Sequence, residues 1–102
     1  MTLKLVATSQ FKKDYKRVKK RGLDISELHR ILDKLRCEEP LEERHRDHAL
    51  VGTYEGFHEC HIRPDWLLIY AINKGQLVLI ASRAGTHSDL LYVPLILEER
   101  YA

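Results

Sequence analysis

The sequence predicts an α+β domain in which two N-terminal helices pack on one face of a small, antiparallel-dominated twisted sheet. Three observations lead to this prediction. An apolar run, LKLVA, comes first; helical periodicity follows; three strand-like runs then occupy the second half of the chain. The 102 residues, 44% of them apolar, suffice for one compact domain with a modest core.

The first strand is expected at Leu3–Ala7, followed directly by a helix. Ser9 is a suitable N-cap for this helix. Its apolar stripe is formed by Phe11, Tyr15 and Val18, spaced four and three residues apart. Gly22 fits the position just past the helix end, where glycine adopts a left-handed conformation at little cost.

The second helix is expected to begin after Asp24. Glu27 lies three residues further on, in a spacing typical of a capping box. The helical period is carried by Ile25, Leu28, Ile31, Leu32 and Leu35. Pro40 ends this region, and a charged loop runs to Asp47; a connection of this length is more often functional than idle. The two helices therefore form a short-linked hairpin.

Three strands complete the predicted sheet. The run Tyr54–Ile62 alternates, with Cys60 and Ile62 on one face and Glu59 and His61 on the other. Trp66–Ile72 is continuously apolar, which is typical of a central strand buried on both faces. A hairpin turn at residues 73–75 leads into the last strand, Gln76–Arg83.

The net charge of +2 conceals an uneven distribution. Between residues 12 and 21 a single acid, Asp14, stands among seven basic residues: Lys12, Lys13, Lys16, Arg17, Lys19, Lys20 and Arg21. Such a segment presents a positive surface to an anionic partner, although charged helix faces are usually just solvated. Binding to DNA is a weaker alternative because no helix-turn-helix pattern accompanies the basic helix.

The sequence favours a cytoplasmic protein. The N-terminus lacks the apolar core of a signal peptide, and no run approaches the ~20 apolar residues of a membrane span. Cys37 and Cys60 are too isolated to indicate a disulfide framework, so they are expected to be reduced thiols.

Five residues are candidates for catalysis: His48, His61, Asp65, Arg83 and His87. Neighbouring strands lie ~5 Å apart, so these residues can converge on the open face of the sheet. Imidazoles can act as base and acid near neutrality, and arginine can bind the phosphate. The indole of Trp66 would stack on an RNA base. The set suits RNA cleavage by the RNA's own 2′-hydroxyl, without a metal or a small-molecule cofactor.

Simpler interpretations stand beside this one. A strand histidine is more often solvated than catalytic, Trp66 is equally suited to the core, and Arg83 can pair with a carboxylate for structural reasons. A zinc site is a further alternative, since His45-x-x-His48 and His58-x-Cys60-His61 offer ligands. Their spacing fits no closed structural zinc pattern, so we expect no metal site.

The motifs taken together resemble the YafQ branch of the RelE toxin superfamily. The resemblance lies in the run RDHALVGTYEGFHECHIRPDWLLIY followed by SRAGTHSDL, and it spans residues 1–91. It implies a RelE-like fold and a ribosome-dependent mRNA endonuclease of a type II toxin–antitoxin system. The implied partners are a cognate antitoxin and mRNA on the ribosome, with contacts to 16S rRNA. The alternative is a member of the same fold that has lost catalysis and only binds the ribosome or antitoxin.

The resemblance also implies roles for individual residues. His48, His61, Asp65, Arg83 and His87 take the places of the family's catalytic set. Substrate binding is expected of Trp66, Leu91 and the basic helix, through Lys12, Lys13, Lys16, Lys19 and Lys20. Two positions depart from the family pattern: Leu91 replaces an aromatic residue, and His58 replaces an arginine. Residues 92–102 form a C-terminal extension of unknown role.

Overall fold

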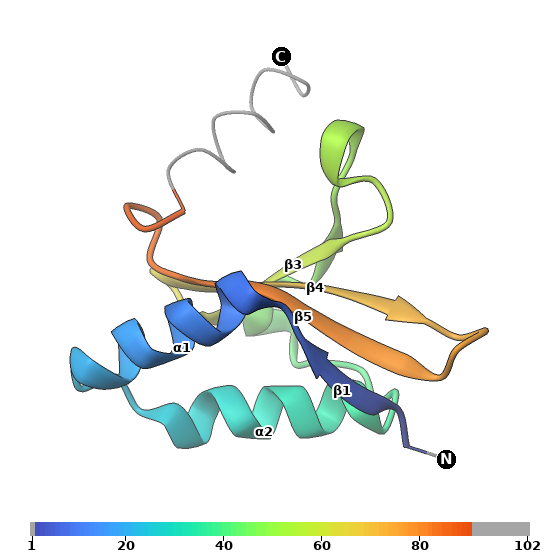
Figure 1. Ribbon diagram of the computed structural model, residues 1–102, viewed down its shortest axis with the longest axis horizontal. Coiled ribbons are helices and arrows are strands. Elements are labelled where there is room, and N and C mark those ends of the chain that lie inside the picture. Colours follow the sequence, from blue (N-terminus) through green and yellow to red (C-terminus); the bar gives the residue numbers. More distant parts are fainter. Residues whose placement is uncertain (1, 91–102) are drawn as a thin grey trace.

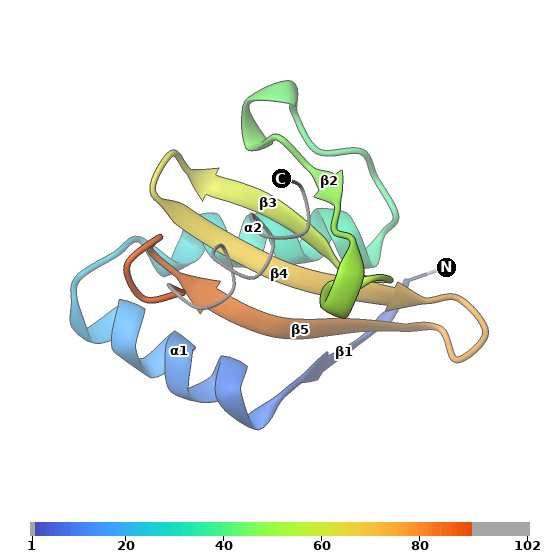
Figure 2. The same cartoon turned by 90° about the horizontal axis from the view of Figure 1, so that it is seen from above.

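The computed structural model describes residues 2–90, with the side chain of Thr53 excepted. The elements are, in order, β1 (Lys4–Ala7), α1 (Ser9–Lys20), α2 (Ile25–Arg36), β2 (His48–Ala49), β3 (His58–Arg63), β4 (Trp66–Asn73) and β5 (Val78–Gly85), with 3-10 turns at Glu43–His45 and Gly52–Tyr54. Both helices lie on one face of the sheet (Figures 1 and 2). The predicted α+β architecture is confirmed.

The five strands form one sheet in the order β1-β5-β4-β3-β2 (Figure 2). The first strand pairs with the last in parallel, and every other pair is antiparallel. This topology places β4 at the centre and brings the exit of β5 beside the β3–β4 turn. Leu91 and the extension 92–102 lie outside the described residues.

The main core lies between the helices and the sheet. It contains Phe11 and Val18 of α1, Leu28, Ile31, Leu32 and Leu35 of α2, and Cys60, Ile62, Trp66, Leu68, Tyr70, Leu79, Ala81 and Ala84 of the sheet. A smaller cluster covers part of the opposite face and contains Leu50, Leu67, Ile69 and Leu90. Residues 66–70 of β4 are all buried, as the continuous apolar run predicts.

The two helix starts differ in part from the prediction. Thr8, not Ser9, caps α1: its side chain accepts a hydrogen bond from the Phe11 backbone N–H. Asp24 caps α2 as expected, accepting from the Ser26 N–H. The capping box is not formed, because the Glu27 carboxylate is bound by both Nε and Nη2 of Arg63. No helix within residues 2–90 is long and apolar enough to cross a membrane.

The bounds of β3 and β5 also differ from the prediction. Strand β3 starts at His58 rather than at Tyr54, because residues 52–57 turn twice and pack the Tyr54 and Phe57 rings edge to face at a centroid distance of 6.1 Å. Strand β5 runs from Val78 to Gly85 rather than over residues 76–83. The turn before it extends to Leu77, which has a positive φ of 56°.

Candidate active site

A β-bulge in β5 turns Arg83 out of the core. Ile69 pairs with Arg83, whereas the next residue of β4, Tyr70, pairs with Ala81, so Ser82 is an extra residue. Simple alternation from Leu79 and Ala81 would point residue 83 toward the helices. With the bulge, Ala84 takes the core position and Arg83 shares a face with Ile69. Bulges commonly re-aim a side chain beside an active site.

The face of the sheet opposite the helices, which carries Ile69 and Arg83, is called the open face. A cluster at one end of it is formed by His61, Asp65 and His87. The rings of His61 and His87 are 6.0 Å apart between centroids. The His87 ring donates through Nδ1 to Asp65 at 2.5 Å, and its backbone N–H donates to the same oxygen at 3.2 Å. These hydrogen bonds hold the pKa of the Asp65 carboxyl below its usual range. Three residues predicted from the sequence are therefore brought together.

His48 lies further along the same face, opposite Glu59 of β3. Its Nδ1 donates to the Arg46 carbonyl at 2.7 Å, and its Nε2 is 3.5 Å from Glu59 Oε1. The preceding residue, Asp47, accepts from the hydroxyl of Tyr70 at 2.5 Å, which ties the loop to the centre of the sheet. Burial and this hydrogen bond raise the pKa of Tyr70, so the hydroxyl remains a donor.

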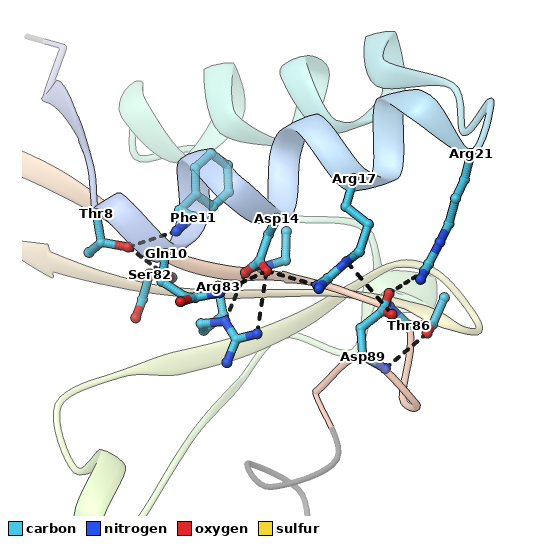
Figure 3. A network of polar contacts seen from close by, with 11 residues as sticks. Thr8, Gln10, Phe11, Asp14, Arg17, Arg21, Ser82, Arg83, Thr86 and Asp89 are labelled. Atoms are coloured by element: carbon cyan, nitrogen blue, oxygen red, sulfur yellow. Dashed lines mark hydrogen bonds and ion pairs between the residues drawn. The ribbon is translucent and has the colours of Figure 1, made fainter.

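Arg83 stands two strands away from Glu59 in the same row of the sheet, since both pair with Ile69. Its guanidinium binds Asp14 of α1, with Nε to Oδ2 at 2.8 Å and Nη2 to Oδ1 at 3.3 Å (Figure 3). The side chain remains 23% exposed. Arg83 therefore pairs with a carboxylate, which the sequence analysis gave as the alternative to a catalytic role. The guanidinium nevertheless still reaches the surface.

Three acidic residues of the site were not singled out from the sequence: Asp14, Glu59 and Asp89. The sequence signal for Asp14 is its spacing: it lies three residues after Phe11 and four before Val18, on the apolar face of the helix, where an acid indicates a buried partner. Asp89 binds Arg21 and the Thr86 backbone N–H (Figure 3). Burial opposes ionisation of Asp89, yet these hydrogen bonds lower its pKa to about 2.

The residues expected to bind substrate differ in where the structure places them. Trp66 is 2% exposed and packs in the main core, on the face away from His61, so the prediction that it stacks on a base does not fit its position. Leu91 lies outside the described residues. The five lysines of α1 are exposed, whereas Arg17 of α1 and Arg21, the residue that caps its end, turn toward Asp14 and Asp89 (Figure 3).

The residues considered for zinc are divided between the two faces. His58 stacks on Tyr70 on the helix side at a centroid distance of 5.4 Å, while His61 faces His87 on the other side. His45 is buried and donates to the His61 carbonyl at 2.6 Å. Among residues 2–90, no three His, Cys, Asp or Glu side chains are grouped as metal ligands.

Comparison with known proteins places this geometry in a family. Residues 3–92 match the model of the bacterial toxin of type II toxin–antitoxin systems, YafQ. The mRNA interferase toxin YafQ of Escherichia coli K12 is 34% identical over 84 residues, covering 81% of this chain and 89% of the relative. Two crystal structures are similar over 98% of their own chains. One is the E. coli DinJ–YafQ toxin–antitoxin complex, with 32% identity, 88% of this chain covered and a TM-score of 0.79. The other is a metal-bound toxin from Helicobacter pylori, with 39% identity, 86% covered and a TM-score of 0.81.

The match extends over nearly the whole described chain, and it includes the helical hairpin as well as the strands that carry the histidines. The chain therefore belongs to the YafQ family of toxins of bacterial type II toxin–antitoxin systems.

Proposed function

We propose that this toxin is a metal-independent endoribonuclease that cuts mRNA on the ribosome. The observation that carries the proposal is the pairing of His61 with the His87–Asp65 dyad on an exposed face. Two imidazoles at this separation can serve the attacking and leaving oxygens of one phosphate. The relatives named mRNA interferases supply the substrate class.

The reaction follows from the tautomers that the hydrogen bonds select. The Nδ1–H of His61 donates to the Pro64 carbonyl at 3.2 Å, so its neutral ring carries the lone pair on Nε2. His61 then takes the proton of the 2′-hydroxyl, whose oxygen forms a bond to phosphorus. The bond to the 5′-oxygen breaks as protonated His87 donates to it, leaving a 2′,3′-cyclic phosphate and a 5′-hydroxyl.

Asp65 and His48 take supporting positions in this scheme. Asp65 is bound twice by His87, so its place is to stabilise the His87 imidazolium rather than to act as the base. His48 is the second candidate base; its Nδ1 is bound to the Arg46 carbonyl and its Nε2 lies 3.5 Å from Glu59 Oε1, so in this scheme it is given a contact with the phosphate. Arg83 binds the non-bridging oxygens.

The cleavage assay tests the proposal directly. Purified toxin with translating ribosomes should cut mRNA, should cut the same RNA poorly without ribosomes, and should keep its rate in EDTA. Loss of cleavage in EDTA with recovery on adding zinc, magnesium or copper would overturn metal independence; copper belongs in the test because a related toxin mutant has been crystallised with it. A toxin that binds ribosomes without cutting would favour the alternative, a binding member without catalysis.

The exposed lysines of α1 supply the contact with ribosomal RNA. Phosphate contacts dominate affinity for nucleic acids and weaken with salt. Reversing Lys12, Lys16, Lys19 and Lys20 to Glu should weaken ribosome binding by at least tenfold at low salt and leave the unfolding midpoint almost unchanged. Sedimentation of ribosomes with the variant measures this, and binding equal to that of the unaltered toxin would show that the helix face is merely solvated.

A cognate antitoxin is the expected partner, as in the DinJ–YafQ complexes. We expect it to bury either the helical hairpin or the open sheet face with an acidic segment that orders on binding. A hollow of about 470 Å³ between α2 and the end of β3 supports the first surface, because Arg30 and Lys34 line it beside the ion pairs Arg44–Glu42 and Arg63–Glu27. An interface that avoids both surfaces would contradict this expectation.

A further inference from the structure

Asp14 is a fully buried carboxylate with an unusual number of donors. Its side chain is 0% exposed, and it accepts from Arg83, from Arg17 Nη2 at 2.8 Å and from the Ala84 backbone N–H at 3.0 Å (Figure 3). A buried charge is tolerated only when it is paired and hydrogen-bonded. Two guanidinium groups converge on this one carboxylate, and Arg17 is shared with Asp89, so Asp14 is held by more donors than a simple ion pair needs.

The end of β1 creates the place that Asp14 occupies. Strand β1 pairs with β5 only as far as Ala7 and Ala81. Beyond that point no strand formed by residues 2–90 lies beside the edge of β5, and the Ala84 N–H points toward α1. The Asp14 carboxylate accepts this N–H where the next residue of a longer β1 would have done so. Thr8 fixes the bulge beside it, donating through its hydroxyl to the Ser82 carbonyl at 2.8 Å.

The contact with Arg83 uses only one side of the guanidinium. Asp14 accepts from Nε and Nη2, the side-on pair of donors, and none of the contacts of Arg83 within residues 2–90 involves Nη1. Each Nη carries two N–H groups, so the end-on pair, formed by Nη1 and the second N–H of Nη2, can still bind another acceptor. A guanidinium binds phosphate through such a pair of parallel donors.

We propose that Asp14 is the positioning residue of this active site: it holds Arg83 so that the end-on donors of the guanidinium face the phosphate to be cut. Without it, the long side chain would lose its fixed orientation at the bulge. The proposal rests on the proposed nuclease function, because it assigns Arg83 the phosphate.

A neighbouring pair of contacts fixes the other half of the site from the same helix. Arg21 Nη1 donates to Asp89 at 2.5 Å, and Arg17 Nε lies 3.7 Å from the same carboxylate. Asp89 in turn accepts from the Thr86 N–H, next to His87. Helix α1 thus sets the position of Arg83 through Asp14 and of the His87 turn through Asp89.

A double-mutant cycle separates positioning from mere stabilisation. We expect Asp14→Asn to lower kcat for ribosome-bound mRNA by roughly 10²-fold, as small displacements of catalytic groups do, with a smaller change in KM. Arg83→Gln should lower kcat at least as much, and the double variant should be no slower than Arg83→Gln alone. Independent, multiplying losses in the double variant would overturn the proposal, since a purely structural role does not require Arg83.

Asp24→Ala is the stability control, because it removes the exposed carboxylate that caps α2, and within residues 2–90 this carboxylate hydrogen-bonds only Ser26. It should lower stability but leave kcat unchanged when the assay is run well below its unfolding midpoint. If the unaltered toxin cuts no RNA, the proposed function fails; if it cuts and the cycle shows independent losses, only the role of Asp14 fails.

Nuclear magnetic resonance of the unaltered toxin keeps the proposal testable if Asp14→Asn does not fold. The Arg83 Nε–H signal should exchange slowly with water because it donates to a buried carboxylate. Adding inorganic phosphate, or a 2′-O-methyl RNA oligonucleotide that cannot be cut, should shift the Nη signals and leave Nε–H in place. Rapid exchange of Nε–H, or its release when either probe binds, would overturn the proposal.

Discussion

Replacing His87 by alanine is expected to reduce mRNA cleavage by about 10²–10⁴-fold, the usual contribution of a general acid or base. The imidazole is the only part of His87 that meets the substrate in the proposed reaction, and it is 52% exposed. The backbone N–H that also binds Asp65 is retained in the alanine variant. The fold should therefore survive, because exposed side chains contribute little to stability. Single-turnover cleavage rates and growth arrest on expression measure the effect.

The control for His87 is His29→Ala. His29 is an exposed histidine of α2 whose ring bonds the Tyr15 hydroxyl at 2.8 Å, far in sequence from the cluster. This variant should remain toxic and cleave at nearly the normal rate. The ends of the products give an independent check, since attack by the 2′-hydroxyl yields a 2′,3′-cyclic phosphate or the 3′-phosphate formed from it. A 3′-hydroxyl product, or full toxicity of His87→Ala, would rule out the mechanism.

The histidine cluster was predictable from the sequence because each step relied on local rules. Alternation within β3 separates His61 from Cys60 and Ile62, and a short turn after β5 returns His87 to the same face. The antiparallel connection of β3 to β4 then fixes Asp65 at the end where His87 arrives. These inferences need only strand periodicity and short loops, which a single sequence carries well.

The environment of Arg83 could not be predicted from the sequence, for a physical reason. No glycine or proline at the Ser82 bulge indicates it in the sequence. The bulge moves every later residue of β5 to the opposite face of the sheet from the one that simple alternation predicts. The partner that binds Arg83, Asp14, lies 69 residues earlier in the chain. Thr8 and Ser9 illustrate a smaller ambiguity, because neighbouring hydroxyl residues are nearly equal as helix caps and only the chain path decides between them.

The orientation of Trp66 was ambiguous in the sequence, because a continuous apolar run has no polar–apolar alternation to show which of its side chains face the helices. In the structure Leu67 pairs with His61 and lies on the open side, so Trp66 points toward the helices. Trp66 packs with Leu68 and Tyr70 in the main core rather than beside the histidines. A base-stacking role and a core role now make opposite predictions for substitutions at this residue.

Trp66→Ala is expected to lower the free energy of unfolding by about 3–5 kcal/mol, the typical cost of truncating a buried aromatic residue. This is a large part of the ~5–15 kcal/mol available to a domain, so the variant should be partly unfolded at growth temperature. Urea denaturation followed by circular dichroism measures the loss. Cleavage should fall only in proportion to the folded fraction.

Trp66→Phe separates the two roles. The indole Nε1 is buried and has no hydrogen-bond partner within residues 2–90, so phenylalanine removes an unpaired donor while it keeps an aromatic ring in the core. An unpaired buried donor costs about 1–3 kcal/mol, which offsets much of the loss from the smaller ring. We therefore expect Trp66→Phe to be almost as stable as the unaltered toxin and to cut mRNA at nearly the same rate. A Trp66→Phe protein that is fully folded but cuts many-fold more slowly would show that the indole meets the substrate after all, which would require β4 to open at its first residue.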